Sequence, residues 1–143
     1  IVESVLNEQY SKLLSQMKTE KTVVAASVEN EVHQIGLKMV SDIFEMWGFN
    51  VHYLGANNPL YDLLNFLDTV KPDILAVSVS ISYHLKSLEK LIEEINHRNP
   101  DIMIMAGGQG LRFNYKDFLK KYPNIIYLAD LYALEDFLRK TKS

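Results

Sequence analysis

The sequence contains no cysteine among its 143 residues. This absence excludes disulfide bonds, thiolate metal sites and cysteine nucleophiles. It also fits a cytoplasmic protein, because disulfide-rich chains belong to oxidising compartments. No apolar run reaches the roughly 20 residues of a membrane-spanning helix, and no signal peptide precedes the first predicted strand. We therefore expect a cytoplasmic protein with no membrane contact.

The net charge is small, at -3, although the content of charged residues, 23%, is ordinary for a globular protein. This balance argues against direct nucleic-acid binding by this segment. The 48% hydrophobic content is enough for a globular core, and the length fits one domain. The chain begins at Ile1 rather than at a methionine, so we expect it to be a fragment of a longer protein.

Apolar runs typical of strands alternate with segments of helical periodicity. The predicted strands are 22–27, 51–54, 74–79, 102–106 and 125–128. The predicted helices are 2–17, 35–47, 60–70, 85–97, 115–121 and 131–140. Strands separated by helices predict a parallel sheet. We expect a flavodoxin-like (Rossmann-like) fold of five strands in the order 2-1-3-4-5, with helices on both faces over residues 21–143, preceded by an N-terminal helix within residues 1–20.

The loop after the first strand carries Glu31-Val32-His33. In an open α/β sheet this loop lies at the carboxyl edge, where ligands bind. An imidazole there can ligate a metal, and a nearby carboxylate can fix its tautomer. The alternative is an ordinary surface loop, because short motifs also occur by chance.

Two further groups belong to the same edge. Ser78 and Ser80 end or follow the third strand, and Gly107-Gly108 follow the fourth. Serines at a strand end can simply satisfy local backbone groups, and glycines can simply make a turn. All three groups together would line one crevice beside the switch point, between the first and third strands.

The combination of E-x-H-x-x-G over residues 31–36, S-x-S over 78–80 and G-G at 107–108 resembles the cobalamin (B12)-binding domain family. The likeness extends from Lys21 to about Arg139. It implies cobalamin as cofactor, with adenosyl or methyl as the upper ligand. It further implies that the benzimidazole tail leaves cobalt and threads between the strand ends.

The resemblance assigns roles to particular residues. His33 would be the lower axial cobalt ligand, and Glu31 would engage its other nitrogen. Gly36 would let the following helix approach the ligand. Ser78 would hydrogen-bond the tail, with Ser80 beside it. Gly107 and Gly108 would let the nucleotide loop lie against bare backbone.

Two positions depart from the family pattern. Ser80 stands where the S-x-L motif has leucine, which bears on the tail contact. Glu31 stands where the D-x-H motif has aspartate. E-x-H resembles the sensory domains of MerR-type, B12-dependent transcription regulators more than the methyl carriers. In both groups a helical bundle caps the upper face of the cofactor, and the 2–17 helix would be its last helix.

We therefore expect a corrinoid-binding sensory domain of a transcription regulator, which is not itself an enzyme. Its expected partners are the corrinoid, an N-terminal helical cap, a DNA-binding domain and a second copy of the chain. The alternatives are a methyl-carrier corrinoid protein of a methyltransferase system and a domain of this fold that mediates protein contacts without cofactor. His84 and His97 lie on a helical pattern and are expected at the surface.

Overall fold

The computed structural model describes residues 21–28, 35–79, 84–113 and 115–142. The strands are β1 (Thr22–Ser27), β2 (Asn50–Gly55), β3 (Ile74–Ser78), β4 (Met103–Gly107) and β5 (Ile126–Leu128). The helices are α2 (Ile35–Met46), α3 (Leu60–Val70), α4 (Leu85–Arg98), α5 (Tyr115–Lys121) and α6 (Leu131–Lys142), with a short 3-10 helix η2 (Gln109–Leu111). The predicted elements of this region are confirmed to within about two residues at their ends. The predicted helix over 2–17 lies outside the described residues.

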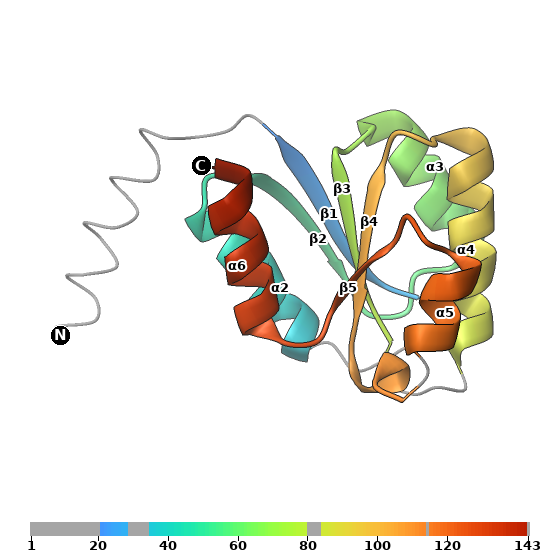
Figure 1. Cartoon of the computed structure of the whole chain (residues 1–143). Coiled ribbons are helices and arrows are strands. Elements are labelled where there is room, and N and C mark those ends of the chain that lie inside the picture. The colour runs from blue at the N-terminus through green and yellow to red at the C-terminus, as the bar shows by residue number, and fades with distance from the viewer. Residues whose placement is uncertain (1–20, 29–34, 80–83, 114, 143) are drawn as a thin grey trace, which may run out of the picture.

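The described strands are parallel and lie in the order β2-β1-β3-β4-β5, as predicted. Helices α2 and α6 cover one face of the sheet, and α3, α4 and α5 cover the other (Figure 1). The order reverses direction between β1 and β3, which makes the carboxyl ends of these two strands the switch point of the sheet.

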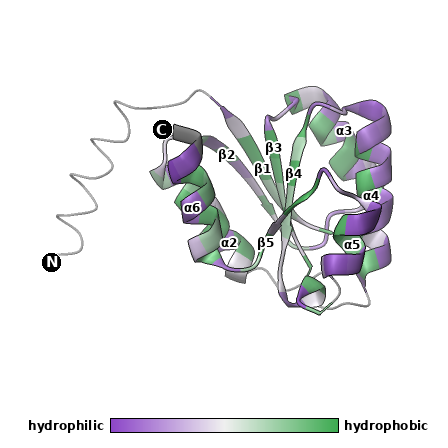
Figure 2. Ribbon diagram, in the orientation of Figure 1, coloured by the Kyte–Doolittle hydropathy of each residue, from purple (hydrophilic) through white to green (hydrophobic). Residues whose placement is uncertain are grey.

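A hydrophobic core lies on each face of the sheet. The central strands β1 and β3 are buried along nearly their whole length, as expected for parallel strands that are covered on both sides. Figure 2 shows hydrophobic colour on the strands and on the inner sides of the helices, and hydrophilic colour on their outer sides. None of the described helices is both long and apolar enough to cross a lipid bilayer.

Local sequence signals explain how α2 ends. Gly48 adopts a positive φ of 88° directly after this helix. The N–H of Phe49 donates to the carbonyl of Phe44 at 3.1 Å, and the two rings meet edge to face at 5.2 Å. This is a Schellman termination, in which glycine reverses the chain and an apolar pair seals the end. The turn brings the chain directly into β2.

A cavity at the carboxyl edge of the sheet

The register of the sheet brings four strand ends into one row. Ser27 of β1 pairs with Ser78 of β3, Ser78 pairs with Gly107 of β4, and Gly107 pairs with Leu128 of β5. Partners in register point their side chains to the same face of a parallel sheet. The predicted site residues Ser78 and Gly107 are therefore neighbours, although they lie far apart in the sequence.

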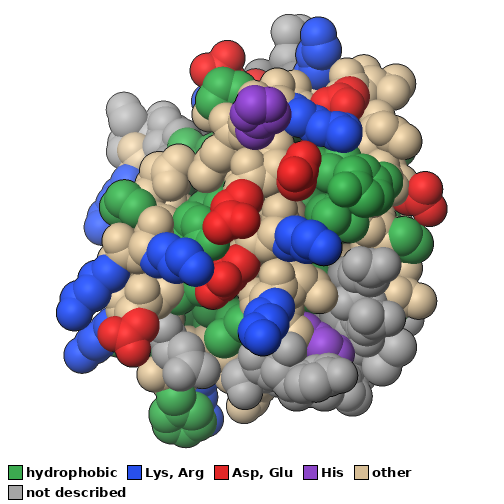
Figure 3. Space-filling view, turned by 90° about the vertical axis from the view of Figure 1, so that its right-hand side faces the viewer, with side chains coloured by type: hydrophobic (Ala, Val, Ile, Leu, Met, Phe, Trp, Pro, Cys, Tyr) green, Lys and Arg blue, Asp and Glu red, His purple; other side chains and the backbone are tan. Residues whose placement is uncertain are grey.

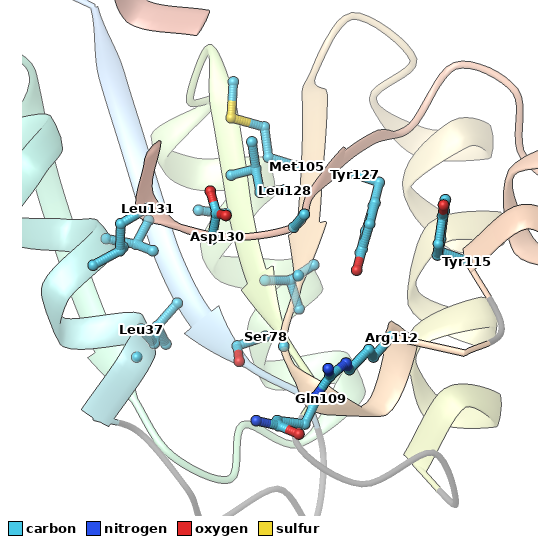
Figure 4. A pocket seen from close by; sticks show the side chains of 17 residues that line it. Leu37, Ser78, Met105, Gln109, Arg112, Tyr115, Tyr127, Leu128, Asp130 and Leu131 are labelled. Carbon is cyan, nitrogen blue, oxygen red and sulfur yellow. The ribbon is translucent and has the colours of Figure 1, made fainter. Parts of the chain in front are cut away.

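A cavity of about 720 Å³ opens beside this row, between α2, the sheet and the start of α6 (Figure 4). It is lined by residues of α2, the ends of β3, β4 and β5, and the loops that follow β4 and β5. The apolar part of the lining comprises Leu37, Val40, Ala76, Val77, Met105, Leu128, Ala129 and Leu131. The polar and glycine part comprises Gly36, Ser78, Gly107, Gly108, Gln109, Arg112, Tyr115, Tyr127 and Asp130.

The cavity exists because side chains become smaller toward the carboxyl edge on this face. Toward α2 and α6 the strands present Val23, Ala25 and Ser27 from β1, Ile74, Ala76 and Ser78 from β3, and Met105 and Gly107 from β4. The large residues at the amino ends fill the space under the helices. The small residues at the carboxyl ends leave space for a ligand of ordinary pocket size.

The glycines that end and follow β4, Gly107 and Gly108, both make close backbone contacts within the protein. A Cβ built on Gly108 would lie 2.4 Å from the Val79 carbonyl oxygen, and the φ of Gly108 is +104°. A Cβ on Gly107 would lie 2.8 Å from the Leu128 carbonyl oxygen. The fold itself requires glycine at both positions, which supports the alternative that these glycines serve the turn after the strand. Both residues also line the cavity, so the structural role does not exclude contact with a ligand.

Gly36 behaves differently. It lies in the first turn of α2 and lines the cavity, and a Cβ built on it would meet nothing within 4 Å among the described residues. Glycine inside a helix costs roughly 0.5–1 kcal/mol relative to alanine. No contact within the described protein explains this glycine, which leaves close approach by a ligand as a physical reason for it.

Ser27 carries a buried hydroxyl without a partner among the described residues. Its side chain is fully buried, and its Oγ makes no hydrogen bond within that part of the chain. An unsatisfied buried hydroxyl costs roughly 1–3 kcal/mol. Its register partner Ser78 lines the cavity, so a polar group that entered between the two serines could satisfy it.

Asn58 holds the end of β1 in place. Its side-chain Nδ2 donates to the carbonyl of Ser27 at 3.0 Å and to the carbonyl of Gly55 at 2.9 Å. These bonds tie the last residues of β1 and β2 together, directly before the loop that carries the E-x-H motif. This role was not predicted, although an asparagine just before Pro59 and a helix is a common turn signal.

Aromatic and charged side chains form the rim of the cavity on the α5 side. The rings of Tyr115 and Tyr127 stack with centroids 4.4 Å apart and an interplanar angle of 8°. Burial raises the pKa of Tyr127, as does the neighbouring Tyr115, whereas the positive charge of Arg112 lowers it. Asp130 accepts the backbone N–H of Ala133 at 2.9 Å and thereby caps α6.

The fates of the predicted site residues differ. The structure brings Gly36, Ser78, Gly107 and Gly108 to one cavity. Glu31, His33 and Ser80 lie outside the described residues, so their roles stay predictions. Among the described residues no cluster of three histidine or carboxylate side chains could hold a metal ion.

The expectation that His84 lies at the surface is wrong. Its exposure is 9%, because it directly precedes α4, whose first turns pack Leu88 into the core. His97, in the last turn of the same helix, is exposed as predicted.

A second, smaller cavity of about 200 Å³ lies on the opposite face. It is lined by Val28, Asn58, Leu60, Leu63, Lys86, Ser87, Lys90 and Leu91. Figure 3 shows lysine, arginine and acidic side chains interspersed over the side of the molecule that carries α4 and α5, without a continuous field of one sign. This pattern gives no support to a nucleic-acid surface there.

A parallel sheet of this order, with a cavity at the carboxyl ends of its strands, defines a flavodoxin-like ligand-binding domain. The model of the B12 binding domain family matches residues 21–137, and the chain belongs to this family. Cobalamin, the cofactor predicted from the sequence, is thus the ligand of the family to which the chain belongs.

Two relatives of known name are similar to part of this chain. The chain is 34% identical over 100 residues to the D-ornithine 4,5-aminomutase subunit beta of Acetoanaerobium sticklandii, a match that covers 64% of this chain and 14% of that protein. It is 26% identical over 116 residues to trimethylamine corrinoid protein 1 of Methanosarcina mazei, a match that covers 79% of this chain and 53% of that protein. The chain thus spans about half the length of that corrinoid protein and a small part of the aminomutase subunit.

Solved structures share the fold. A cobalamin-binding protein from Desulfitobacterium hafniense superposes with a TM-score of 0.78 at 18% identity, over 96% of this chain and 67% of that one. The methanol:cobalamin methyltransferase complex of Methanosarcina barkeri gives a TM-score of 0.71 at 24% identity, over 79% of this chain and 43% of that one. At these identities the similarity supports the fold. None of these four relatives carries the name of a transcription regulator.

Proposed function

We propose that the chain is the corrinoid-binding domain of a methyl-carrier protein that serves a corrinoid-dependent methyltransferase. The observation that carries the proposal is a cavity of about 720 Å³ at the carboxyl edge of a domain of the B12 binding family. The trimethylamine corrinoid protein among the relatives favours the carrier over the sensory domain. In this role the domain binds and presents the cofactor and is not itself the catalyst.

The shape of the cavity suits the tail of a base-off cobalamin. Leu37, Met105 and Leu128 offer apolar walls to a flat benzimidazole ring, and Ser78 offers a hydroxyl for its free nitrogen. The unsatisfied hydroxyl of Ser27 lies one strand away in the same row. Gly36 leaves open space at the start of α2, where bulk would narrow the entrance.

We infer that His33, which follows β1 in the sequence, would be the residue that binds the cobalt. When bound, the corrinoid supplies a cobalt centre that accepts and donates a methyl group, and the protein controls its position and electronics. His33 must be neutral to donate its lone pair to the metal. In this proposal Glu31 would accept a hydrogen bond from the other ring N–H, which would fix the tautomer and raise the basicity of the ligand.

The sensory domain of a transcription regulator remains the second candidate, because Glu31 replaces the aspartate of the carriers. A regulator would change its oligomeric state on binding adenosylcobalamin and again on illumination. A carrier would instead accept a methyl group from a partner methyltransferase. Sedimentation of the full-length protein in darkness and light, beside a methyl-transfer assay, separates the two.

The axial ligand is tested by electron paramagnetic resonance of the domain loaded with cob(II)alamin. Protein labelled with the heavy nitrogen isotope in histidine should show a two-line nitrogen splitting, because the axial nitrogen then comes from the protein. His33→Ala should abolish this splitting, whereas His97→Ala, an exposed histidine, should keep it. A splitting that ignores the label would mean that the benzimidazole stays on cobalt and that His33 is not the ligand.

The same assignment predicts a dependence on pH. Ligation requires a neutral imidazole, so axial binding should weaken as pH falls below the free histidine value of about 6.5. Titrations of the domain with the corrinoid at a series of pH values measure this affinity. An affinity that stays constant from neutral pH to about two units below that value would contradict histidine ligation.

A further inference from the structure

Arg112 stands apart from the other arginines of the chain. The chain has three arginines. Arg98 pairs with Asp68 at 3.2 Å, and Arg139 pairs with Asp136 at 3.4 Å. Within the part of the chain that the structure describes, no carboxylate pairs with Arg112. An arginine without an ion pair keeps five N–H donors in a planar arrangement that matches phosphate oxygens.

Its position is at the mouth of the large cavity. Arg112 directly follows η2, its backbone N–H donates to the carbonyl of Gln109 at 3.2 Å, and both side chains line the cavity. Figure 4 shows the two side chains close to each other near the turn after β4, below Tyr127. The guanidinium carbon also lies 5.6 Å from the ring centroid of Phe113, whose 88% exposure leaves this cation–π contact at the surface.

The electrostatics around Tyr127 agree with this position. The Arg112 charge lowers the pKa of Tyr127 against the stronger effect of burial, so guanidinium and phenol interact across the rim. The carboxylate in the lining, Asp130, already accepts a backbone N–H at the start of α6. The rim on the α5 side therefore combines a positive charge with the neutral donors of Gln109 and Tyr127.

We propose that Arg112, assisted by the side-chain amide of Gln109, binds the phosphodiester of the nucleotide loop of the corrinoid and so selects complete corrinoids over those that lack the tail. The inference rests on the proposed corrinoid function. The phosphodiester is the anionic group that joins the corrin to its lower base. Gly107 and Gly108 line the same cavity as Arg112.

Comparison of two ligands tests the proposal directly. The domain is titrated with cobalamin and with cobinamide, which has the same corrin ring but neither phosphodiester nor base. Arg112→Gln should weaken cobalamin binding about 10- to 100-fold, the range expected for hydrogen bonds to a charged group, and should leave cobinamide binding unchanged. The cobalamin affinity of Arg112→Lys should lie between those of the unchanged protein and Arg112→Gln. Lysine keeps the charge but cannot form the bidentate hydrogen bonds of arginine.

Two controls keep the interpretation specific. Arg139→Gln removes an equal charge from an exposed site on α6 and should leave the affinity for both ligands unchanged. Raising the salt concentration should weaken cobalamin binding more in the unchanged protein than in the Arg112→Gln variant. Salt screens the proposed ion pair between Arg112 and the phosphodiester, which the variant lacks. Thermal unfolding of each variant without ligand confirms that the fold is retained.

The outcomes separate the two proposals. Equal losses for cobalamin and cobinamide in Arg112→Gln, or no loss for either, would overturn the role of Arg112 while leaving the corrinoid function standing. Failure of the unchanged domain to bind either ligand would instead overturn the corrinoid function itself. Selective loss of cobalamin with reduced salt dependence is the result that supports the phosphodiester contact.

Discussion

The two faces of the sheet differ in how closely the side chains of the same strands are packed. The face toward α3, α4 and α5 is packed into a continuous core. This core includes Val24 of β1, Val28 directly after β1, and Leu75 and Val77 of β3. Toward α2 and α6 the side chains of β1, β3 and β4 become smaller toward the carboxyl end, and a cavity of about 720 Å³ remains at the carboxyl edge. The face under α3, α4 and α5 therefore keeps only the smaller cavity of about 200 Å³, whereas the face under α2 and α6 is open over its carboxyl half.

This difference separates stability from binding. Large-to-small changes on the packed face should cost folding free energy, because each leaves a void. Small-to-large changes at the cavity should cost binding, because the space that they fill is not used by the core. The alternation of side chains along a strand means that adjacent residues can serve these two purposes.

The largest expected effect is on the packed face. Leu75 is fully buried, and Leu75→Ala should lower the free energy of unfolding by about 2–5 kcal/mol. Under conditions where the variant stays folded, its affinity for cobalamin should remain close to that of the unchanged protein. Denaturant unfolding followed by ligand titration measures both. A loss of affinity larger than the loss of stability would show that the two faces are coupled.

The matching change on the cavity face is Ala76→Leu, one residue further along β3. Ala76 lines the cavity, and a leucine there would occupy space that the tail needs. We expect cobalamin binding to fall at least about 100-fold, or roughly 2.7 kcal/mol. The free energy of unfolding without ligand should change by less than about 1.5 kcal/mol. Unchanged binding would mean that the tail does not enter the cavity.

Two glycines of the site are expected to serve different purposes, Gly108 the fold and Gly36 the binding of the ligand. Gly108→Ala should lower the free energy of unfolding by about 1–3 kcal/mol, because its Cβ meets the Val79 carbonyl at a positive φ. Gly36→Ala should raise it by about 0.5–1 kcal/mol, because alanine favours the helix and meets no described atom. The same Gly36→Ala variant should bind cobalamin about tenfold more weakly. Denaturant unfolding measures both changes in stability. Equal changes at the two positions would contradict a structural role for Gly108 and a ligand-related role for Gly36.

The smallest effect is expected at the paired serines. Ser27→Ala removes an unsatisfied buried hydroxyl and should raise the free energy of unfolding by about 1 kcal/mol. Ser78→Ala, at a half-buried position, should leave stability nearly unchanged and weaken tail binding by up to about tenfold. Calorimetry with and without cobalamin compares them. A less stable Ser27→Ala would show that the hydroxyl has a partner in the protein.

Much of the fold could be predicted because it depends on local patterns. The apolar runs of β3 and β4, the helical periodicity of α3 and α4, and the glycine after α2 each indicate their own structure. Strands alternating with helices then left few topologies, and the order 2-1-3-4-5 followed. The carboxyl edge was also predictable, because the direction of every strand in a parallel sheet is the same.

Burial and close approach were harder to predict. His84 was expected on an exposed helix face, yet it lies before the first turn of α4 and is buried. Gly108 suggested ligand access, whereas its nearest constraint is the backbone of Val79. Neither result is visible in a local pattern, because burial and close approach depend on how the folded chain packs.

The order of the elements, the parallel sheet and the family motifs that point to a corrinoid all follow from the amino-acid sequence. Which strand face holds the cavity, and the row formed by Ser27, Ser78 and Gly107, emerge from the assembled sheet. The same is true of Arg112, which pairs with no described carboxylate and lies on the rim with Tyr127. Sequence periodicity records which side chains share a face, whereas register, volume and charge pairing arise only when distant segments meet.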